Sequence, residues 1–404
     1  MGGMKFGVKA REGETLGSLA REYGVSPEAM RRLNSDGAFD AKLSAGTLVR
    51  LPREAVDMGA MRETQIREND GFETASPRVQ DRLLGAAGRK GASLGALMAR
   101  EPGFYELSDA DQNRVLDLDR HLSSSGREAV QELVRSGRLF DQDTQGGTAL
   151  DHLTTLSVGD RSRRFTREGV SRKEMVSSLA TEMADPYSIN QGSKGTCTMT
   201  STSFELARDN PAEYGRLVAG LSSSGGEVKM ANGETLAARP SYYANDSATN
   251  RSPTERILQA SLMDFGNGEM DYDNAKDAHL GYLGRVDQDG GLYGRQTHRA
   301  RSALFDTPHT IVGGSRASEQ EVLAALQDRP PGGGITLFPA GAEDSHMVTF
   351  ERIEDGRIYF RNPWGGDGNT YAGARREGPG GLESLPIGGD VAVVEAVLPE
   401  TPRA

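Results

Sequence analysis

The alternation of apolar and polar residues predicts a small strand–helix–helix–strand unit at the start of the chain. Residues 6–9 alternate as a short strand does, and 43–52 form a predicted returning strand that ends in a proline. Between them, Thr15 is a predicted N-cap for a first helix, and Ser26 with Pro27 opens a second one. The apolar positions of the first helix follow the i, i+3, i+4, i+7 spacing and are Leu16, Leu19, Ala20 and Tyr23.

Residues 54–184 divide into two regions with different patterns. Charged runs and Gly-rich turns predict a linker over 54–105. Apolar residues at helical spacing then predict a helical segment over 106–184, with helices beginning near Ser108 and covering 128–139, 149–156 and 174–183. The residue types of this segment indicate packing rather than chemistry. An inhibitory or positioning role toward the region that follows is the alternative.

Two features stand out beyond residue 184. A Gly-rich turn at 192–195 leads into a predicted helix over 198–208, so Cys197 is expected at the helix N-terminus. Further along, the alternating run 346–350, a Glu-Asp-Gly turn and a second run at 357–360 predict a β-hairpin. His346 begins its first strand and Asn362 follows its second, so we expect their side chains to meet.

Composition excludes several classes of protein. Acidic residues outnumber basic ones by 58 to 47, and the net charge of −11 argues against a binder of nucleic acid backbones. The apolar runs are far shorter than the roughly 18 residues that span a bilayer, so no membrane span is predicted. One cysteine excludes an intrachain disulfide framework and a Cys-rich metal site, and no cofactor is predicted. The carboxylates of 271–277 do not match an EF-hand and predict a solvated loop.

The N-terminal pattern resembles a LysM module. The motifs that carry the resemblance are Gly13-Glu14-Thr15-Leu16, Tyr23-Gly24-Val25, Leu33-Asn34, Leu43 and Gly46-Thr47-Leu48 through Leu51-Pro52. It implies binding of N-acetylglucosamine chains, as in peptidoglycan or chitin, through the loops at 13–16 and 34–39. The implied glycan-binding residues are Gly13, Glu14, Thr15, Leu16 and Asn34. The alternative is a small stabilising module without glycan affinity.

The surroundings of Cys197 predict an activated thiol. The exposed N–H groups and the dipole at a helix N-terminus favour the thiolate, and a neighbouring imidazolium lowers a thiol pKa much further. Among six histidines, His346 is the one that begins an alternating strand. Asn362 is expected to orient the imidazole through its amide oxygen, and Trp364, the only tryptophan, is expected to shield that hydrogen bond from water.

This constellation resembles the papain-like cysteine peptidases, including their calpain branch with its Asn-Pro-Trp-Gly element. Gln191 lies six residues before Cys197, where that family has its oxyanion-hole glutamine. His346 follows Cys197 by 149 residues, within the interval of roughly 130–150 known for this fold, and Asn362 follows 16 residues later. The resemblance implies Cys197 as nucleophile, His346 as acid and base, Asn362 as its orienting residue, and Gln191 with the Cys197 backbone N–H as oxyanion donors.

The sequence therefore predicts an α+β chain with four parts. These are a βααβ LysM-like module at 4–53, the linker, the helical segment, and a papain-like domain at 185–404 in which a helix carries the cysteine and a hairpin carries the histidine and asparagine. The expected function is a cysteine peptidase acting on a protein or peptide and directed to a peptidoglycan or chitin-type glycan. Transglutaminase, deamidase or peptidoglycan amidase chemistry is the enzymatic alternative, and a non-catalytic glycan-binding protein with a degenerate papain-like domain is the other.

Localisation follows from two opposing observations. The LysM resemblance predicts an exported or cell-envelope protein, such as an exported bacterial effector. The N-terminus has no apolar segment of the signal-peptide type, so export would use another route, and a cytoplasmic location is the alternative.

Overall fold

The computed structural model resolves the chain into two compact units, Met1–Leu116 and Asp117–Ala404. It describes residues 7–10, 13–22, 30–31, 34, 41–50, 64–69, 71–87, 93–245, 250–268, 270–281, 285–314, 318–341, 345–365 and 370–400. Within these ranges, no helix combines the length and the apolar composition that a bilayer span requires.

The N-terminal module contains the two predicted strands and the first predicted helix. Strands β1 (Gly7–Lys9) and β2 (Leu48–Arg50) pair antiparallel. Helix α1 (Leu16–Glu22) begins where Thr15 caps it, because the Ser18 N–H donates to Thr15 Oγ1 at 3.0 Å. Its predicted core positions Leu16, Leu19 and Ala20 are buried. Most of the second predicted helix and of the loop at 34–39 lies outside the described residues.

The predicted linker over 54–105 is wrong for the part of that range which the structure describes. Its elements are η1 (Phe72–Thr74), α4 (Pro77–Ala87), α5 (Leu94–Met98) and α6 (Pro102–Tyr105), and α7 (Asp109–Asp117) follows them. Val79 and Leu83 of α4 are fully buried, and Ala86 faces Gly95 of α5. A Cβ at Gly95 would lie 2.8 Å from the Ala86 Cβ, so this glycine permits close helix packing instead of marking a loose connection.

The predicted helical segment is confirmed as helical, but from Asp117 onward it is part of the same unit as the chain that follows it, whereas residues 106–116 belong to the first unit. Helix α11 contacts α8 and α9 of the segment and also α13 and α14 beyond residue 185. The helices of this unit up to residue 188 are η2 (Leu118–His121), α8 (Ser124–Arg135), η3 (Arg138–Phe140), α9 (Ala149–Val158), α10 (Arg163–Arg167), α11 (Arg172–Ala184) and η4 (Pro186–Ser188).

The C-terminal half of the second unit contains a mixed set of helices and strands. Its helices are α12 (Cys197–Asp209), α13 (Pro211–Ser222), η5 (Pro240–Tyr243), α14 (Pro253–Asn267), α15 (Gly294–Phe305) and α16 (Glu319–Leu326). Two small antiparallel sheets comprise β3 (Glu227–Lys229) with β4 (Thr235–Ala237), and β5 (Asp271–Asp273) with β6 (Ala278–Leu280) and β7 (Val286–Asp289).

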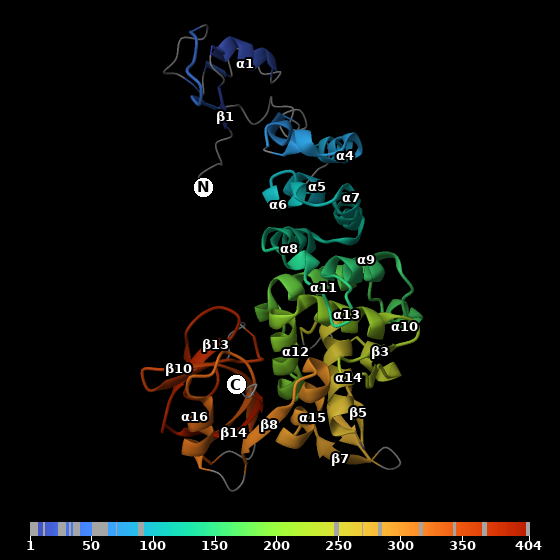
Figure 1. Ribbon diagram of the computed structural model, residues 1–404, viewed down its shortest axis with the longest axis vertical. Coiled ribbons are helices and arrows are strands. Elements are labelled where there is room, and N and C mark those ends of the chain that lie inside the picture. The colour runs from blue at the N-terminus through green and yellow to red at the C-terminus, as the bar shows by residue number, and fades with distance from the viewer. Residues whose placement is uncertain are drawn as a thin grey trace. The chain divides into compact units, whose positions relative to one another are not determined.

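The described strands near the C-terminus form a seven-stranded antiparallel sheet in the order β12-β13-β11-β10-β9-β14-β8. Their bounds are β8 (His309–Gly313), β9 (Gly334–Pro339), β10 (His346–Glu354), β11 (Arg357–Arg361), β12 (Arg375–Arg376), β13 (Leu382–Pro386) and β14 (Val391–Pro399). Figure 1 shows this sheet and α16 as one lobe of the unit, beside a lobe of helices. Val322 and Leu326 of α16 pack with Val348 and Phe350 in the core of the sheet lobe.

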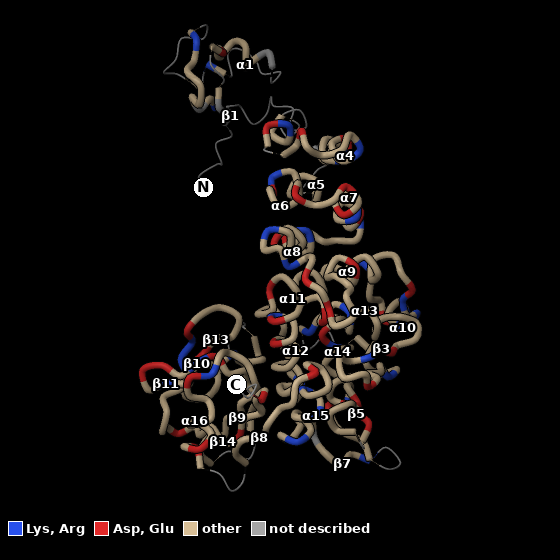
Figure 2. Tube along the Cα trace, in the orientation of Figure 1, with Lys and Arg blue, Asp and Glu red and all other residues tan. Residues whose placement is uncertain are grey.

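Helix α12 joins the two lobes. It contacts β10 and β9 of the sheet lobe and α13 and α14 of the helical lobe, and residues 197–207 are all buried. Side-chain hydroxyls tie this helix to its surroundings: Thr202 donates to the Thr198 carbonyl at 2.8 Å, and Thr349 of β10 donates to the Ser201 carbonyl at 3.3 Å. Acidic and basic residues are interspersed over the helices and strands of the unit (Figure 2).

Candidate functional site

The predicted nucleophile lies where the sequence places it. Cys197 is the first residue of α12, after the Gly-rich turn, and is 9% exposed. It packs against Met347 and Val397, so the start of α12 faces the start of β10. Ser201, one turn further on, contacts the Met347 carbonyl, which shows that α12 runs along β10 from this end.

The β-hairpin that carries His346 and Asn362 is confirmed. Strands β10 and β11 pair antiparallel, with Phe350 opposite Phe360. Side chains two residues apart share a face of a sheet, so Asn362 lies on the same face as His346, one diagonal step away. His346 Nε2 and Asn362 Oδ1 are 2.9 Å apart, and both residues are buried.

Glu383 of β13 fixes the orientation of the Asn362 amide. The Asn362 Nδ2 donates to Glu383 Oε1 at 3.1 Å, and the other carboxylate oxygen accepts the Tyr371 N–H at 2.9 Å. Oδ1 of Asn362, which can only accept, therefore faces His346 and also accepts the Trp364 N–H at 3.1 Å. The network thus assigns the proton of neutral His346 to Nε2 and leaves Nδ1 as its basic nitrogen.

Two aromatic rings cover the imidazole. The ring centroid of Trp364 lies 4.5 Å from that of His346, and the Tyr371 centroid lies 5.3 Å from it, with interplanar angles of 29° and 14°. Trp364 and Tyr371 are 5.8 Å apart, so the three rings form one cluster rather than a sandwich. The sequence predicts that Trp364 covers the hydrogen bond between His346 and Asn362. Tyr371 and Glu383 were not predicted, because nothing in their local pattern distinguishes them.

Burial sets the protonation of the thiol and the imidazole, and its effect differs from the prediction. Burial raises the pKa of Cys197, although the backbone N–H groups of Met347 and Thr198 near the sulfur lower it. Burial also lowers the pKa of His346 to about 4, and the hydrogen bond to Asn362 only partly offsets this. Both shifts favour a neutral thiol and a neutral imidazole, not the ion pair that the helix N-terminus predicts.

Cys197 packs against Met347, the residue after His346, but its thiol makes no hydrogen bond to the His346 imidazole. Both residues are among those that the structure describes. Tyr371 lies beside His346 and within electrostatic range of Cys197. Its ring stacks on His346, and its pKa is raised to about 12 by burial and by the charge that Cys197 carries when ionised.

Gln191 is buried beside the hairpin. Its backbone N–H donates to the Pro363 carbonyl at 2.9 Å, which ties it to the segment between Asn362 and Trp364. Its side-chain amide nitrogen donates to the Lys194 carbonyl at 2.6 Å. This bond uses one of the two amide N–H groups and fixes the side chain within the turn that precedes Cys197.

The turn before Cys197 is held by a residue from the predicted solvated loop. Asp277 accepts the Gly195 N–H at 2.7 Å and the Tyr272 hydroxyl at 2.7 Å, so its carboxylate supports the turn and is not merely solvated. A Cβ at Gly195 would lie 2.8 Å from the backbone of Gly290, which explains the glycine at this position. Only the pairing of a Gly-rich turn with a distant acidic turn could have indicated this role of Asp277. A local sequence pattern does not reveal such a pairing.

The five predicted glycan-binding residues do not share one environment. Leu16 is 2% exposed, so its side chain belongs to the core of the module. Asn34 also acts structurally: its side chain accepts the Arg50 N–H and donates to the Arg50 carbonyl, both at 2.7 Å. Gly13, Glu14 and Thr15 form the turn before α1, where the Gly13 N–H donates to the Leu43 carbonyl at 3.1 Å.

The low pKa of His346 predicts a loss of stability in mild acid. The unfolded chain binds this proton near pH 6.5, whereas the native state binds it only near pH 4, so the unfolded state holds more protons in between. The contribution of neutral His346 to the free energy of unfolding is fully present above pH 6.5. It is lost as the pH falls to 4, and the loss is about 3 kcal/mol. Urea unfolding followed by Trp364 fluorescence should show that the free energy of unfolding depends less on pH in His346→Gln than in the wild type. An equal dependence on pH in both proteins would contradict this prediction.

Comparison with known proteins identifies one region. Residues 8–52 match the LysM domain family, so the N-terminal module is a LysM domain with bounds close to the predicted 4–53. No curated protein matches the chain. A LysM domain suggests binding of glycan or peptidoglycan.

Proposed function

We propose that the second unit is a thiol-dependent hydrolase, namely a cysteine peptidase that acts through Cys197, His346 and Asn362. The observation that carries this proposal is the fixed tautomer of His346, whose protonated Nε2 is bound to Asn362 and whose basic Nδ1 remains available. The single thiol of the chain lies at the helix terminus that faces the same strand end. A thiol, a basic ring nitrogen and an orienting amide are the groups that nucleophilic catalysis by cysteine requires.

In the proposed reaction the thiol proton moves to His346 Nδ1 as the sulfur of Cys197 attacks the carbonyl carbon of an amide. The Cys197 N–H and the second amide N–H of Gln191 stabilise the resulting oxyanion, a type of contact worth about 3 kcal/mol per donor. The tetrahedral intermediate expels the amine, which takes the proton from Nδ1 and leaves an acyl-thioester. Water then attacks the thioester, gives its proton to Nδ1, and releases the acid and the thiol.

The neutral resting state assigns a particular role to His346. Because burial disfavours both the thiolate and the imidazolium, the proton moves during the attack, and His346 acts as a general base instead of holding a preformed ion pair. The rings of Trp364 and Tyr371 exclude water from the imidazole and so maintain this state.

The LysM domain supports a substrate near a glycan polymer. In this proposal it binds N-acetylglucosamine-containing chains and thereby raises the local concentration of peptide bonds attached to or lying beside them. The same domain favours one second candidate, a peptidoglycan amidase, because that reaction also begins with acyl transfer to sulfur and uses the same residues.

The first test is the reaction of the thiol with a thiol-directed epoxide at neutral pH, measured by intact mass. The chain has one cysteine, so a single adduct reports on Cys197 alone. We expect labelling of the wild type about 10²-fold faster than labelling of His346→Ala, because general-base assistance contributes at least that factor. His121→Ala is the matched control and should label at the wild-type rate. Labelling no faster than that of free cysteine would overturn the proposal.

A second measurement separates the reaction types. Peptides and muropeptides are profiled after incubation with the wild type and with Cys197→Ala. New peptide termini support the peptidase, altered muropeptides support the amidase, and mass shifts of about one unit indicate deamidation.

A further inference from the structure

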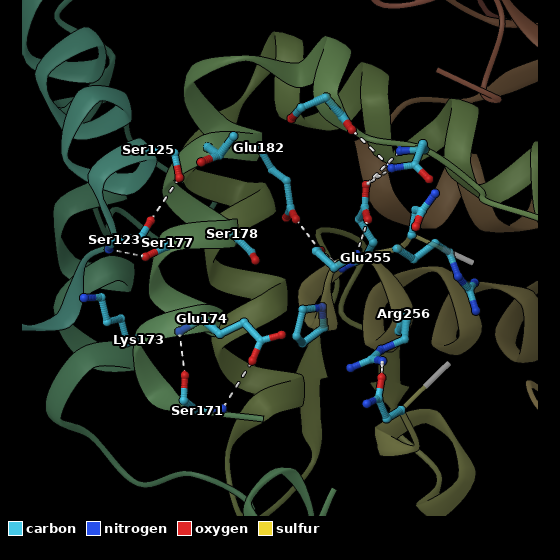
Figure 3. A pocket seen from close by; sticks show the side chains of 18 residues that line it. Ser123, Ser125, Ser171, Lys173, Glu174, Ser177, Ser178, Glu182, Glu255 and Arg256 are labelled. Carbon is cyan, nitrogen blue, oxygen red and sulfur yellow. Dashed lines mark hydrogen bonds between the residues drawn. The ribbon is translucent and has the colours of Figure 1, made fainter. Parts of the chain in front are cut away.

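A pocket of about 750 Å³ lies in the second unit along one face of α11 and between the N-terminal ends of α8 and α14, and Cys197 is not among its lining residues. Figure 3 shows the residues that line it, nearly all of which have polar side chains. Helix α11 contributes residues at i, i+3, i+4, i+7 and i+8, so one face of the helix lines the pocket with Glu174, Ser177, Ser178, Thr181 and Glu182. Two of the lining carboxyl groups, those of Glu182 and Glu255, are buried.

Glu182 is surrounded by hydroxyl groups. Thr254 Oγ1 lies 2.6 and 2.8 Å from its two carboxyl oxygens, and the Tyr214 hydroxyl lies 2.8 Å from Oε2. The Ser252 hydroxyl also contacts Oε1. A hydroxyl group can donate or accept, so each of these contacts persists whether Glu182 is ionised or protonated.

Glu255 is surrounded by N–H groups. Its Oε1 accepts the backbone N–H of Asn190 at 2.7 Å and the Asn190 side-chain amide at 3.3 Å, and its Oε2 accepts the Ser252 N–H. These groups only donate, so an O–H on a protonated Glu255 would have no acceptor among them. Ser252 therefore bridges the two carboxyl groups, through its hydroxyl to Glu182 and its N–H to Glu255.

The contacts decide which carboxyl group carries a shared proton. Burial raises the pKa of Glu182 to about 7, and burial with the charge of Glu182 raises that of Glu255 to about 8. The higher of these pKa values would leave the last proton on Glu255, but an O–H there would have no acceptor, whereas the hydroxyl partners of Glu182 can accept. We therefore assign the last proton of the pair to Glu182 and the negative charge to Glu255, and this proton leaves as the pH rises above about 7.

We propose that Glu182 and Glu255, bridged by Ser252, act as a coupled carboxyl pair that holds the Asn190–Gln191 segment in place, so that the order of this segment depends on pH. Glu255 binds both N–H groups of Asn190, and Gln259 of the same helix donates to the Asn190 carbonyl at 2.9 Å. Gln191, the next residue, is tied to Pro363 beside Asn362. Its role as oxyanion donor rests on the proposed function; the coupling of the pair to the segment does not.

Other charged groups around Glu182 and Glu255 determine whether the order of the segment falls or rises with pH. Those in contact or electrostatic range are Tyr214 of α13, Arg251 before α14, Arg361 of β11, and Lys173, Glu174 and Arg256 on the pocket wall. Arg251 and Arg361 favour the single charge on Glu255. Loss of the shared proton adds a second buried negative charge beside the first, which opens the segment as the pH rises.

Hydrogen exchange of the full-length chain tests the proposal without reference to catalysis. The measured quantity is the protection factor, corrected for intrinsic exchange, of a peptide covering 188–194. We expect it to fall by up to about tenfold per pH unit above pH 7, because opening the segment exposes the Glu182 carboxyl to solvent, where its pKa returns to about 4.5. Protection that is constant from pH 6 to pH 9 would overturn the proposal.

Three variants separate the pair from general stability. Glu182→Gln keeps a neutral group among the hydroxyls and should remove the pH dependence while preserving the fold. Glu255→Gln places an amide N–H against N–H donors and should lower protection at every pH by about tenfold or more. Glu174→Gln, on the same face of α11 and on the same pocket wall, is the control and should retain the wild-type pH dependence.

The outcomes remain decisive if Glu255→Gln does not fold. In that event the comparison of Glu182→Gln with Glu174→Gln still applies, since both keep the N–H contacts of Glu255. A pH dependence that persists in Glu182→Gln, or disappears in Glu174→Gln, contradicts the proposal. Failure of the epoxide test at Cys197 would overturn the proposed function and leave this coupling unaffected.

Discussion

Replacement of Cys197 with alanine is expected to lower the rate of substrate hydrolysis by at least about 10⁴-fold, with substrate binding unchanged. The reason is that the chain has one thiol, and no other side chain can form the acyl intermediate that the proposed reaction requires. The measurement is single-turnover cleavage of the first peptide or muropeptide identified by profiling, with binding of the same compound determined separately by calorimetry.

The companion variant His346→Ala tests whether the two residues act as one unit. Its loss of hydrolysis rate should be of similar size. The double variant Cys197→Ala with His346→Ala should be no slower than either single variant, because the effects of groups that act together in one step are not additive. Multiplicative losses, or a Cys197→Ala protein that keeps more than about a tenth of its rate, would show that the thiol is not the nucleophile and would leave a LysM domain joined to a binding unit.

The elements that bear the candidate site could be predicted because each has a strong local pattern. The alternation of 346–350 and of 357–360 around a Glu-Asp-Gly turn specifies β10 and β11, where Asp355 and Gly356 adopt positive φ angles of 49° and 70°. The register of that hairpin then brings His346 and Asn362 together. Similarly, Cys197 lies at a helix terminus because a Gly-rich turn precedes a run of helix-compatible residues.

The remainder of the site depends on contacts between distant segments. Glu383 and Tyr371 reach Asn362 and His346 only after β13 pairs with β11, and their own sequence pattern is that of ordinary strand and loop residues. The protonation of Cys197 was predicted in the wrong direction for the same reason. A helix terminus can be seen in the sequence, but the burial that outweighs it arises from Met347 and Val397, which are far along the chain.

Glycine content was the other source of error. The glycines of 54–105 contributed to the predicted linker, yet Gly95 occurs where Ala86 approaches within contact distance of the missing Cβ; Gly195, in the predicted turn, is approached in the same way by Gly290. In such positions the residue permits packing, and composition alone does not separate the two uses. The apolar stripe of α4, with Val79 and Leu83 fully buried, was the better indicator of structure in that region.

Helix α12 carries a buried ion pair toward its C-terminal end, opposite to the end where Cys197 lies. Arg301 of α15 is fully buried and donates to Glu205 Oε1 at 2.6 Å, and the other carboxyl oxygen of Glu205 accepts the Gly333 N–H at 2.7 Å. The pair thereby connects α12 to α15 and to the residue before β9. Arg301→Met is expected to destabilise the second unit by about 3–5 kcal/mol, because it leaves the Glu205 charge buried without its cation.

Unfolding in urea, followed by Trp364 fluorescence, measures this effect on the unit that contains the only tryptophan. Adding Glu205→Gln to Arg301→Met should restore much of the loss, because a neutral amide oxygen still accepts the Gly333 N–H and no unpaired charge remains. Glu132→Gln breaks a pair on α8 whose side chains are 49% and 54% exposed, and should cost less than about 1 kcal/mol. If Arg301→Met costs no more than this exposed control, the pair does not hold α12 in place.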